Sequence, residues 1–540
     1  MNTREKISNF FPSEKQIPAE YQVPYQEQKE FLINGEIRTW NGPAQEVLSP
    51  ICLNQDGKVT PKILGYYPQL TEKEALEALE AATKAYDHGK GPWPMMSVGD
   101  RIYCMADFVA MMKKKRGEVI NLLMWEIGKS LEDSAREFDR TVIYIEDTIN
   151  ALKALDRDAS RFAIKSQIIA QVRRAPLGVV LCMGPYNYPL NETFTTLIPA
   201  LIMGNTVIFK PPKLGVLLHR PLLECFKKSF PSGVVNTLYG EGRTVMGPLM
   251  KSGQIDALAF IGSSKVADAL KSQHPMPHRL RCVLGLEAKN PAIILPDADL
   301  ETTIKECVLG SLSFNGQRCT ALKILFVHQS IEKEFLAKLS LAIEALSFGM
   351  PWEKGVFLTP LPGLDKVSYM KALVEDATAQ GAKVINPNGG QSNGTFFFPA
   401  LTFGLKETMR LYKEEQFGPI VAVTTYQDIK EPIDYMIKSN YGQQVALFGS
   451  NPSDLAKLID PLANQVCRVN INSQCQRGPD DYPFTGRKDS AEGTLSVSDA
   501  LRVFSIRTMV AAKESDLNRD IINDIVRQRR SQFLSTDFIL

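Results

Sequence analysis

The stretch LGVVLCMGPYNYPLNETFTTLIPALIMGNTVIFKPP, residues 177–212, carries the pattern that decides the fold. Two short runs rich in apolar and β-branched residues, 178–183 and 206–209, flank an apolar-faced segment with helical spacing, 194–203. A strand, a helix and a second strand in this order predict two parallel strands joined by a crossover helix.

The same alternation continues along the chain beyond this stretch. Strand-like runs recur at 234–238, 257–261 and 292–295, and helical segments at 217–230 and 265–272 lie between them. A looser version of the pattern extends from about residue 300 to residue 475. We therefore expect an α/β protein with two doubly wound domains, whose ligands bind at the carboxyl ends of the parallel strands.

The remaining segments have other patterns. Residues 71–90 and 100–155 have helical periodicity, whereas residues 1–65 predict an extended arm with short strands, one of them at 30–37. Residues 157–176 are polar and strand-like. The charged tail after residue 512 has apolar residues at helical spacing, which predicts a docking helix.

The bulk composition narrows the class of protein. A chain of 540 residues exceeds one hydrophobic core, so two large domains are expected. Lys+Arg number 62 and Asp+Glu 60, a balance that argues against nucleic acid as a partner. The nine cysteines include no CxxC pair, which favours a reducing compartment and argues against a zinc site or any other metal site. The first residues do not resemble a secretory signal, and no apolar run approaches about 20 residues, so the expected location is the cytoplasm, away from membranes.

One cysteine has an unusual context. Cys319 lies in SFNGQRCTALK, residues 313–323, where Asn315-Gly316 marks a turn before an apolar strand. The neighbouring Arg318 predicts a thiol pKa below its ordinary value, because a fixed positive charge favours thiolate. The five histidines lie in other segments, so the sequence does not indicate a protease-like Cys/His dyad.

Five motifs in order identify a resemblance. The Cys319 segment, GPYNYPLNE at 184–192, PALIMGNTVIFKPP at 199–212, LAFIGSSKVA at 258–267 and EEQFGPIVAV at 414–423 together resemble the aldehyde dehydrogenase superfamily over roughly residues 30–510. The resemblance implies two α/β domains with a small oligomerisation element, in a homo-oligomer that is a dimer or tetramer. The implied parts are a dinucleotide-binding domain (1–156 and 177–290), oligomerisation strands (157–176 and 490–515), a catalytic domain (291–489) and a C-terminal helical tail (516–540).

The resemblance also implies a chemistry for the cysteine. The Cys319 thiolate adds to an aldehyde, and the Asn187 side chain and the Cys319 N–H stabilise the oxyanion. Hydride then passes to a nicotinamide and leaves a thioester, which water cleaves with the help of a general base. Taken without the resemblance, Asn187 is also compatible with a turn before Pro189.

The cofactor assignment rests on three segments that match the family. Gly262 and Ser263 end a strand and begin a helix, where backbone N–H groups suit a phosphate. Glu415 matches the residue that holds the nicotinamide ribose, and Phe417 matches the ring beside it. Lys210 and Lys213 favour NADP, because members that prefer NAD often have Glu at position 213, and an ammonium attracts the 2′-phosphate. The alternative is that Lys213 points to solvent.

The substrate assignment uses four further positions. The chain resembles most the non-phosphorylating, NADP-dependent glyceraldehyde-3-phosphate dehydrogenase branch, which implies that Arg140, Tyr188, Arg318 and Arg477 bind the substrate phosphate, with Thr320 beside them. Arg140 could instead pair with Glu137 one turn away, and Arg477 could be a loop charge.

The match fails at one catalytic position. The family usually has Glu-Leu-Gly-Gly-Lys, with the first Glu as general base, where this chain has GLEAK, residues 285–289. Glu287 could replace the base if Gly285 permits a backbone shift. Otherwise another group serves or deacylation is slow, and Glu287 could instead pair with Lys289 or an arginine. Two rival functions therefore stay open: oxidation of another anionic aldehyde such as a semialdehyde, and a weakly active NADP-binding regulatory protein.

Overall fold

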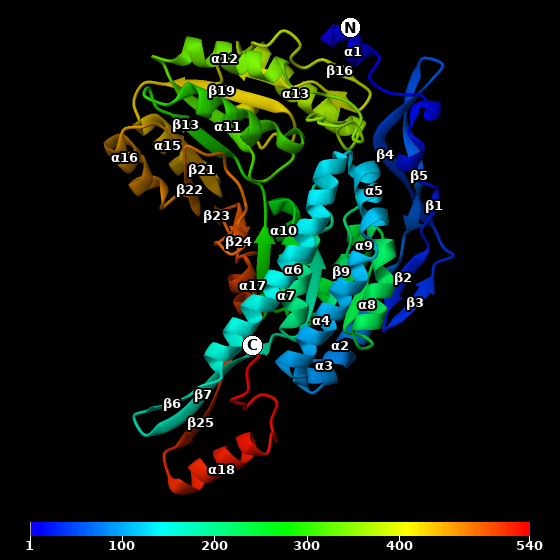
Figure 1. The fold of residues 1–540 in the computed structure, drawn as a ribbon, viewed down its shortest axis with the longest axis vertical. Helices are drawn as coiled ribbons and strands as arrows, with labels where there is room; N and C mark the ends of the chain where they lie inside the picture. The colour runs from blue at the N-terminus through cyan, green and yellow to red at the C-terminus, as the bar shows by residue number, and fades with distance from the viewer. Residues whose placement is uncertain (1, 540) are drawn as a thin grey trace.

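A parallel sheet forms the centre of the molecule in the computed structural model, which describes residues 2–539 (Figure 1). Its strands are, in spatial order, β10 (Val235–Thr237), β9 (Thr206–Lys210), β8 (Val179–Met183), β11 (Ala257–Ile261), β12 (Arg281–Gly285) and β24 (Ala491–Glu492). All neighbours are parallel except β12 and β24. β8 is the first strand of this sheet in sequence, and the later strands are added on both sides of it, which confirms the doubly wound fold.

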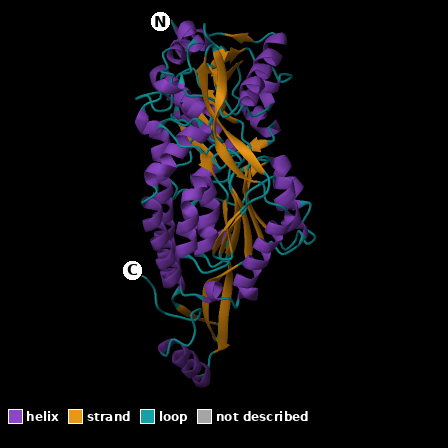
Figure 2. Cartoon of the chain, turned by 90° about the vertical axis from the view of Figure 1, so that its right-hand side faces the viewer, coloured by secondary structure: helices purple, strands orange, loops and turns teal. Residues whose placement is uncertain are grey.

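Helices cover both faces of this sheet (Figure 2). They are α2 (Glu72–Tyr86), α4 (Val98–Lys113), α5 (Arg116–Ile127), α6 (Leu131–Ala159), α7 (Asn191–Ile202), α8 (Leu223–Ser229), α9 (Gly242–Lys251) and α10 (Ser264–Lys271). Every residue of β8 is buried, which explains why its sequence is continuously apolar rather than alternating.

A second α/β layer lies above the first in Figure 1. Its strands are β15 (Lys383–Val384), β18 (Ala400–Phe403), β19 (Ile420–Tyr426), β14 (Leu322–His328), β13 (Asn290–Ile294), β21 (Gln444–Phe448) and β22 (Arg468–Ile471). All neighbouring strands in this sheet are parallel, except that β15 runs antiparallel to β18. The chain passes from the first sheet to the second between Gly285 and Asn290, and this connection contains Glu287.

A third small sheet projects from the body as an arm, at the bottom of Figure 1. It consists of β6 (Phe162–Lys165), β7 (Ile168–Pro176) and β25 (Ser505–Lys513), with β7 in the middle. β25 pairs with β7 in antiparallel register over nine residues, from Ser505 opposite Pro176 to Lys513 opposite Ile168.

The two ends of the chain differ from the sequence prediction. The N-terminal arm contains two long paired strands, β4 (Ala44–Gln55) and β5 (Lys58–Pro68), and the strand expected at 30–37 is the hairpin of β2 (Glu30–Ile33) and β3 (Glu36–Thr39). The tail does form a helix, α18 (Asp516–Arg527), but this helix buries no side chain.

The contact that fixes the tail lies beyond the helix. Leu534 is buried, and the backbone of Ser535 exchanges hydrogen bonds with the Gln171 side chain. None of the helices within residues 2–539 is long and apolar enough to cross a membrane.

Candidate active site

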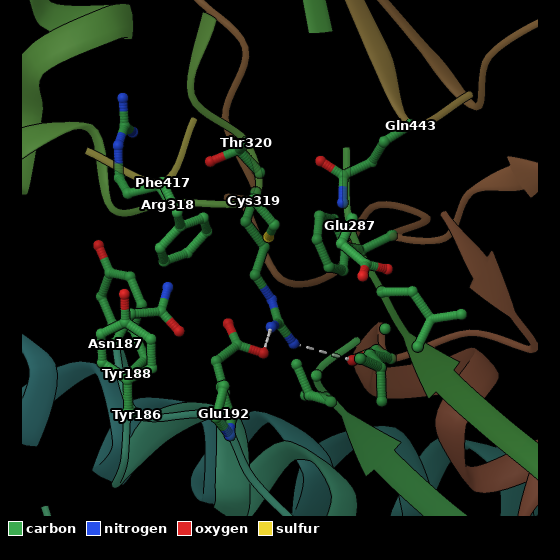
Figure 3. A pocket seen from close by; sticks show the side chains of 18 of the residues that line it. Tyr186, Asn187, Tyr188, Glu192, Glu287, Arg318, Cys319, Thr320, Phe417 and Gln443 are labelled. Atoms are coloured by element: carbon green, nitrogen blue, oxygen red, sulfur yellow. Dashed lines mark hydrogen bonds and ion pairs between the residues drawn. The ribbon is translucent and has the colours of Figure 1, made fainter. Parts of the chain in front are cut away.

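A cavity of 470 Å³ lies between the two large sheets, at the carboxyl ends of β11 and β12. Its wall includes all of the predicted site residues except Lys210 and Lys213. Those lining residues are Arg140, Asn187, Tyr188, Gly262, Ser263, Glu287, Arg318, Cys319, Thr320, Glu415, Phe417 and Arg477. Segments from both α/β layers therefore meet around one space, as Figure 3 shows.

A strained loop presents Cys319 to this cavity. The preceding turn, η5 (Ser313–Gly316), has positive φ angles at Phe314 (49°), Asn315 (54°) and Gly316 (70°). A Cβ on Gly316 would lie 2.6 Å from the Ser311 carbonyl oxygen, so only glycine fits there. Asn315 is held in turn by Thr359, whose N–H donates to Asn315 Oδ1 at 3.1 Å. The loop is thus held by its backbone conformation and by the contact with Thr359.

The electrostatic environment of the thiol is not the one that the sequence predicted. Burial and, less strongly, the charge of Glu192 raise the pKa of Cys319 to about 11, although the Gln443 amide opposes part of the rise. Arg318 contributes no visible stabilisation of thiolate, because its Nη2 donates to the carbonyl oxygens of Leu309 and Gly310 at 3.0 and 2.9 Å. The prediction of a lowered pKa is wrong, because neighbours in sequence can direct their side chains apart.

A buried ion pair that the sequence did not reveal holds the backbone of Asn187, the residue predicted to stabilise an oxyanion. Lys129 pairs closely with Glu137 and also donates to the Asn187 carbonyl oxygen at 3.0 Å. Glu137 accepts from the Leu190 N–H at 3.0 Å, so it holds the start of α7. Asn187 Nδ2 donates to the Gln317 carbonyl oxygen at 2.8 Å, which places this amide against the Cys319 loop. Arg140 therefore does not have Glu137 as its partner.

The cofactor side of the cavity has two features that suit a dinucleotide. Glu287 Oε2 accepts from the Ser264 N–H at 2.8 Å, so an oxyanion already occupies the N-terminus of α10. Glu415 Oε1 is buried and accepts no hydrogen bond within residues 2–539, which suits a sugar hydroxyl. Burial raises the pKa of Glu415 to about 7, although Lys323 at 4.0 Å opposes the rise.

The alternative prediction that Glu287 pairs with Lys289 is wrong. Lys289 is buried and donates to Gln416 Oε1 at 2.5 Å instead. The Glu287 carboxylate lines the same cavity as the Cys319 thiol, and Figure 3 shows both residues beside Gln443.

The two lysines predicted for the 2′-phosphate lie in different environments. Lys213 is exposed and lines a neighbouring hollow of 510 Å³ together with Lys366, which the sequence did not single out. Burial lowers the pKa of Lys210 to about 8, and its Nζ donates to the Pro211 carbonyl oxygen at 3.3 Å. Lys213 is thus the exposed cation of this hollow, whereas Lys366 is half-buried and has Asp365 Oδ2 3.5 Å from its Nζ.

Acidic residues accompany two of the predicted substrate arginines. Asp480 accepts from Arg140 Nη2 at 2.8 Å and from Arg477 Nε at 3.2 Å, and Glu192 forms a close ion pair with Arg477. These arginines hold the pKa of Asp480 below its ordinary value, although burial opposes them. Arg477 is buried, so it is not merely a loop charge.

Tyr188 and Thr320 complete the substrate side. The Tyr188 ring faces the Lys129 ammonium, with Nζ 3.7 Å from the ring centroid, and Thr320 is buried next to the nucleophile. A thiol on a tight loop, an amide directed at that loop and a helix N-terminus in the same cavity are the features expected of a thiol-dependent oxidoreductase on an α/β scaffold.

Comparison with known proteins assigns the family. The chain belongs to the aldehyde dehydrogenase family, whose model matches residues 55–510. It is 32% identical to an NADP-dependent glyceraldehyde-3-phosphate dehydrogenase of Streptococcus equinus over 84% of this chain and 93% of that protein. It is 27% identical to a malonate-semialdehyde dehydrogenase of Bacillus subtilis subsp. natto, over 89% of this chain and 96% of that protein.

A solved structure has the same fold. The NADP-dependent glyceraldehyde-3-phosphate dehydrogenase of Bacillus halodurans C-125, complexed with NADP, superposes with a TM-score of 0.82 at 28% identity. The match covers 91% of this chain and all of that one.

Proposed function

We propose that this protein oxidises glyceraldehyde 3-phosphate to 3-phosphoglycerate with NADP, irreversibly and through a thioester on Cys319. The observation that carries the proposal is that Arg140, Tyr188, Arg318 and Arg477, from four distant segments, line one cavity with that thiol. Guanidinium groups suit the oxygens of a phosphate, and a phenol adds one more donor. The relatives named for this reaction add support.

The catalytic steps use groups in the cavity. The Cys319 sulfur adds to the aldehyde carbon, and the Asn187 amide and the Cys319 N–H stabilise the oxyanion. The bound cofactor supplies the hydride acceptor. Loss of hydride leaves an acyl group on sulfur, and water then attacks the thioester carbonyl while Glu287 takes a proton from the water.

The residues that would hold NADP lie at three places. The Ser264 N–H and the Gly262-Ser263 turn suit a phosphate, and Glu415 suits the nicotinamide ribose with Phe417 beside it. Lys213, which is exposed in the neighbouring hollow, suits the 2′-phosphate.

A second substrate class is favoured by the charge balance of the site. Glu192 and Asp480 neutralise Arg477 and Arg140, and the carbonyls that bind Arg318 are neutral, so the three arginines retain about one net positive charge. One positive charge suits a monoanionic semialdehyde, and a relative named malonate-semialdehyde dehydrogenase agrees with this reading.

The assembly and location follow from exposed surface and cysteine chemistry. β25 is an edge strand with exposed Ile506, Met509 and Val510, so a second copy of the chain is the partner that would cover it, in a dimer or tetramer. All nine cysteines are unpaired, which supports a reducing compartment such as the cytoplasm.

The test is an assay of purified protein with NADP and a panel of aldehydes, without inorganic phosphate. We expect NADPH formation to be fastest with glyceraldehyde 3-phosphate and absent in Cys319→Ser. A higher kcat/KM for malonate semialdehyde would assign the second substrate class. NADP binding without turnover of any aldehyde would identify a regulatory protein instead.

A further inference from the structure

Glu192 faces the cavity from the second position of α7. Its side chain is 11% exposed and forms a close ion pair with Arg477. In Figure 3 it points from the helix into the cavity, on the same side of Cys319 as Asn187 and Tyr188. The carboxylate therefore occupies the part of the cavity where a substrate would lie.

Arg477 has no free donor nitrogen. Nη1 binds Glu192, Nε donates to Asp480 Oδ1 at 3.2 Å, and Nη2 donates to the Leu495 carbonyl oxygen at 3.2 Å. Asp480 is shared with Arg140, whose Nε and Nη2 donate to its two oxygens at 3.1 and 2.8 Å. Glu192 lines the cavity, so an anion that approaches the fork of Arg477 from the cavity meets this carboxylate.

We propose that Glu192 is a specificity-determining residue, an internal counter-anion that the anionic group of a substrate must displace from Arg477. The inference rests on the proposed function, because it assigns the same arginines to the substrate. Asp480 is fixed by two arginines, whereas Glu192 has Arg477 as its one ion-pair partner within residues 2–539. Glu192, rather than Asp480, is thus the residue that leaves Arg477 when an anion binds.

The charge of Glu192 ranks possible substrates. A phosphate dianion near Arg477 is repelled by this carboxylate about twice as strongly as a monoanion, and a neutral aldehyde hardly at all. Glu192 therefore weakens the binding of a doubly charged substrate more than the binding of a singly charged one.

Glu192→Gln is the decisive variant, because the amide keeps the shape and can still accept from Arg477. We expect KM for glyceraldehyde 3-phosphate to fall about tenfold while KM for neutral glyceraldehyde changes less than twofold. Glu192→Asp keeps the charge and should keep the wild-type ratio of the two KM values. Glu224→Gln, an exposed glutamate on α8, is the matched control.

A binding measurement keeps the inference separate from the proposed function. Inorganic phosphate should protect Cys319 from iodoacetamide at about tenfold lower concentration in Glu192→Gln than in the wild type. If the wild type does not oxidise glyceraldehyde 3-phosphate but this shift appears, the proposed substrate fails and the role of Glu192 stands.

Equal phosphate protection in folded Glu192→Gln and wild-type protein overturns the role of Glu192. Equal changes of KM for the charged and the neutral aldehyde overturn it as well. Should Glu192→Gln fail to fold, Glu192→Met repeats both measurements with the charge removed and the volume kept.

Discussion

The carboxylate of Glu287 accepts a hydrogen bond of 2.8 Å from the backbone N–H of Ser264, the first residue of α10. The same N–H group suits a phosphate of the cofactor. Glu287 also lines the cavity that contains the Cys319 thiol. The Glu287 carboxylate thus lies between the proposed phosphate site at Ser264 and the Cys319 thiol. A cofactor phosphate bound at the Ser264 N–H would break its hydrogen bond with Glu287, and the carboxylate would then be free to act as the base on the proposed thioester.

Glu287→Gln tests this carboxylate as the base. An amide cannot take a proton from water at neutral pH, so acylation should survive while hydrolysis is blocked. Rapid mixing with NADP and aldehyde should give a burst of about one NADPH per active site and then a steady rate reduced at least a hundredfold. Wild-type behaviour in both phases would remove Glu287 from the mechanism.

Gly285→Glu restores the acid at the usual family position. A Cβ at Gly285 would lie 3.3 Å from Ile261 Cγ1 and 3.4 Å from Leu495 Cδ1, so only side chains need to adjust. We expect the steady-state rate to rise several-fold if hydrolysis of the thioester limits turnover. Combined with Glu287→Gln, the new glutamate should recover hydrolysis, and a double variant as slow as Glu287→Gln alone would argue that position 285 is too remote.

The raised thiol pKa predicts an unusual pH profile for Cys319. Since burial raises the pKa to about 11, the thiolate fraction without cofactor is small at pH 7 and grows tenfold per pH unit. Iodoacetamide should therefore alkylate Cys319 at a rate that still increases between pH 8 and pH 10, as followed by peptide mass spectrometry. A plateau near pH 7 would instead show a thiol with a lowered pKa.

Lys213→Glu should change the choice of cofactor. The substitution replaces attraction to the 2′-phosphate by repulsion, a difference on the order of 1–3 kcal/mol at an exposed site. We expect the Kd for NADP, measured by fluorescence titration, to rise at least tenfold relative to the Kd for NAD. Lys227→Glu on the surface of α8 is the charge-matched control, and equal loss of both cofactors would separate Lys213 from the phosphate.

Buried Glu126 predicts a pH dependence of stability. Its carboxylate accepts from the N–H groups of Leu217 and Leu218 at 2.9 Å each, and burial raises its pKa from 4.5 to about 8. The neutral form is favoured in the folded state, so the contribution of Glu126 to stability is greatest below pH 4.5 and declines as pH rises to 8, by about 1.4 kcal/mol per unit at most.

Thermal unfolding of Glu126→Gln should show a smaller decline of Tm from pH 5 to pH 8 than the wild type. Glu118→Gln, an exposed change on the same helix, should keep the wild-type slope. Parallel slopes for all three proteins would mean that Glu126 is ionised in the folded state.

The fold and the gathering of the site could be predicted from the sequence because both depend on local pattern. Continuous apolar runs such as that of β8 indicate strands buried on both faces, and parallel strands direct the following loops to one edge. The Gly262-Ser263 turn lies at such an edge because it follows β11, whereas the Cys319 loop precedes β14 of the second sheet and lines the same cavity. Glu415 and Phe417 were placed by the family motif, and they line the same cavity.

The ionic partners could not be predicted because they are far apart in sequence. Arg477 and Glu192 are separated by 285 positions, and Arg140 and Asp480 by 340. The local pattern around Arg140 is compatible with Glu137 as its partner. In the structure, however, Glu137 pairs with the buried Lys129. Arg318 likewise adjoins Cys319 in sequence, yet its guanidinium binds carbonyls at the end of α11 (Leu300–Leu312).

The pairing of β7 with β25 sets an order for folding on the ribosome. One edge of β7 is covered early by β6, but the other stays open until residues 505–513 have been synthesised, and Arg174 then donates to the carbonyl of Arg502, 328 positions later. Because so long a loop is costly to close, we expect this pairing to form late, after the two α/β layers. A chain that stops before residue 505 would keep an unpaired strand edge, which is a site for misassembly with other nascent chains.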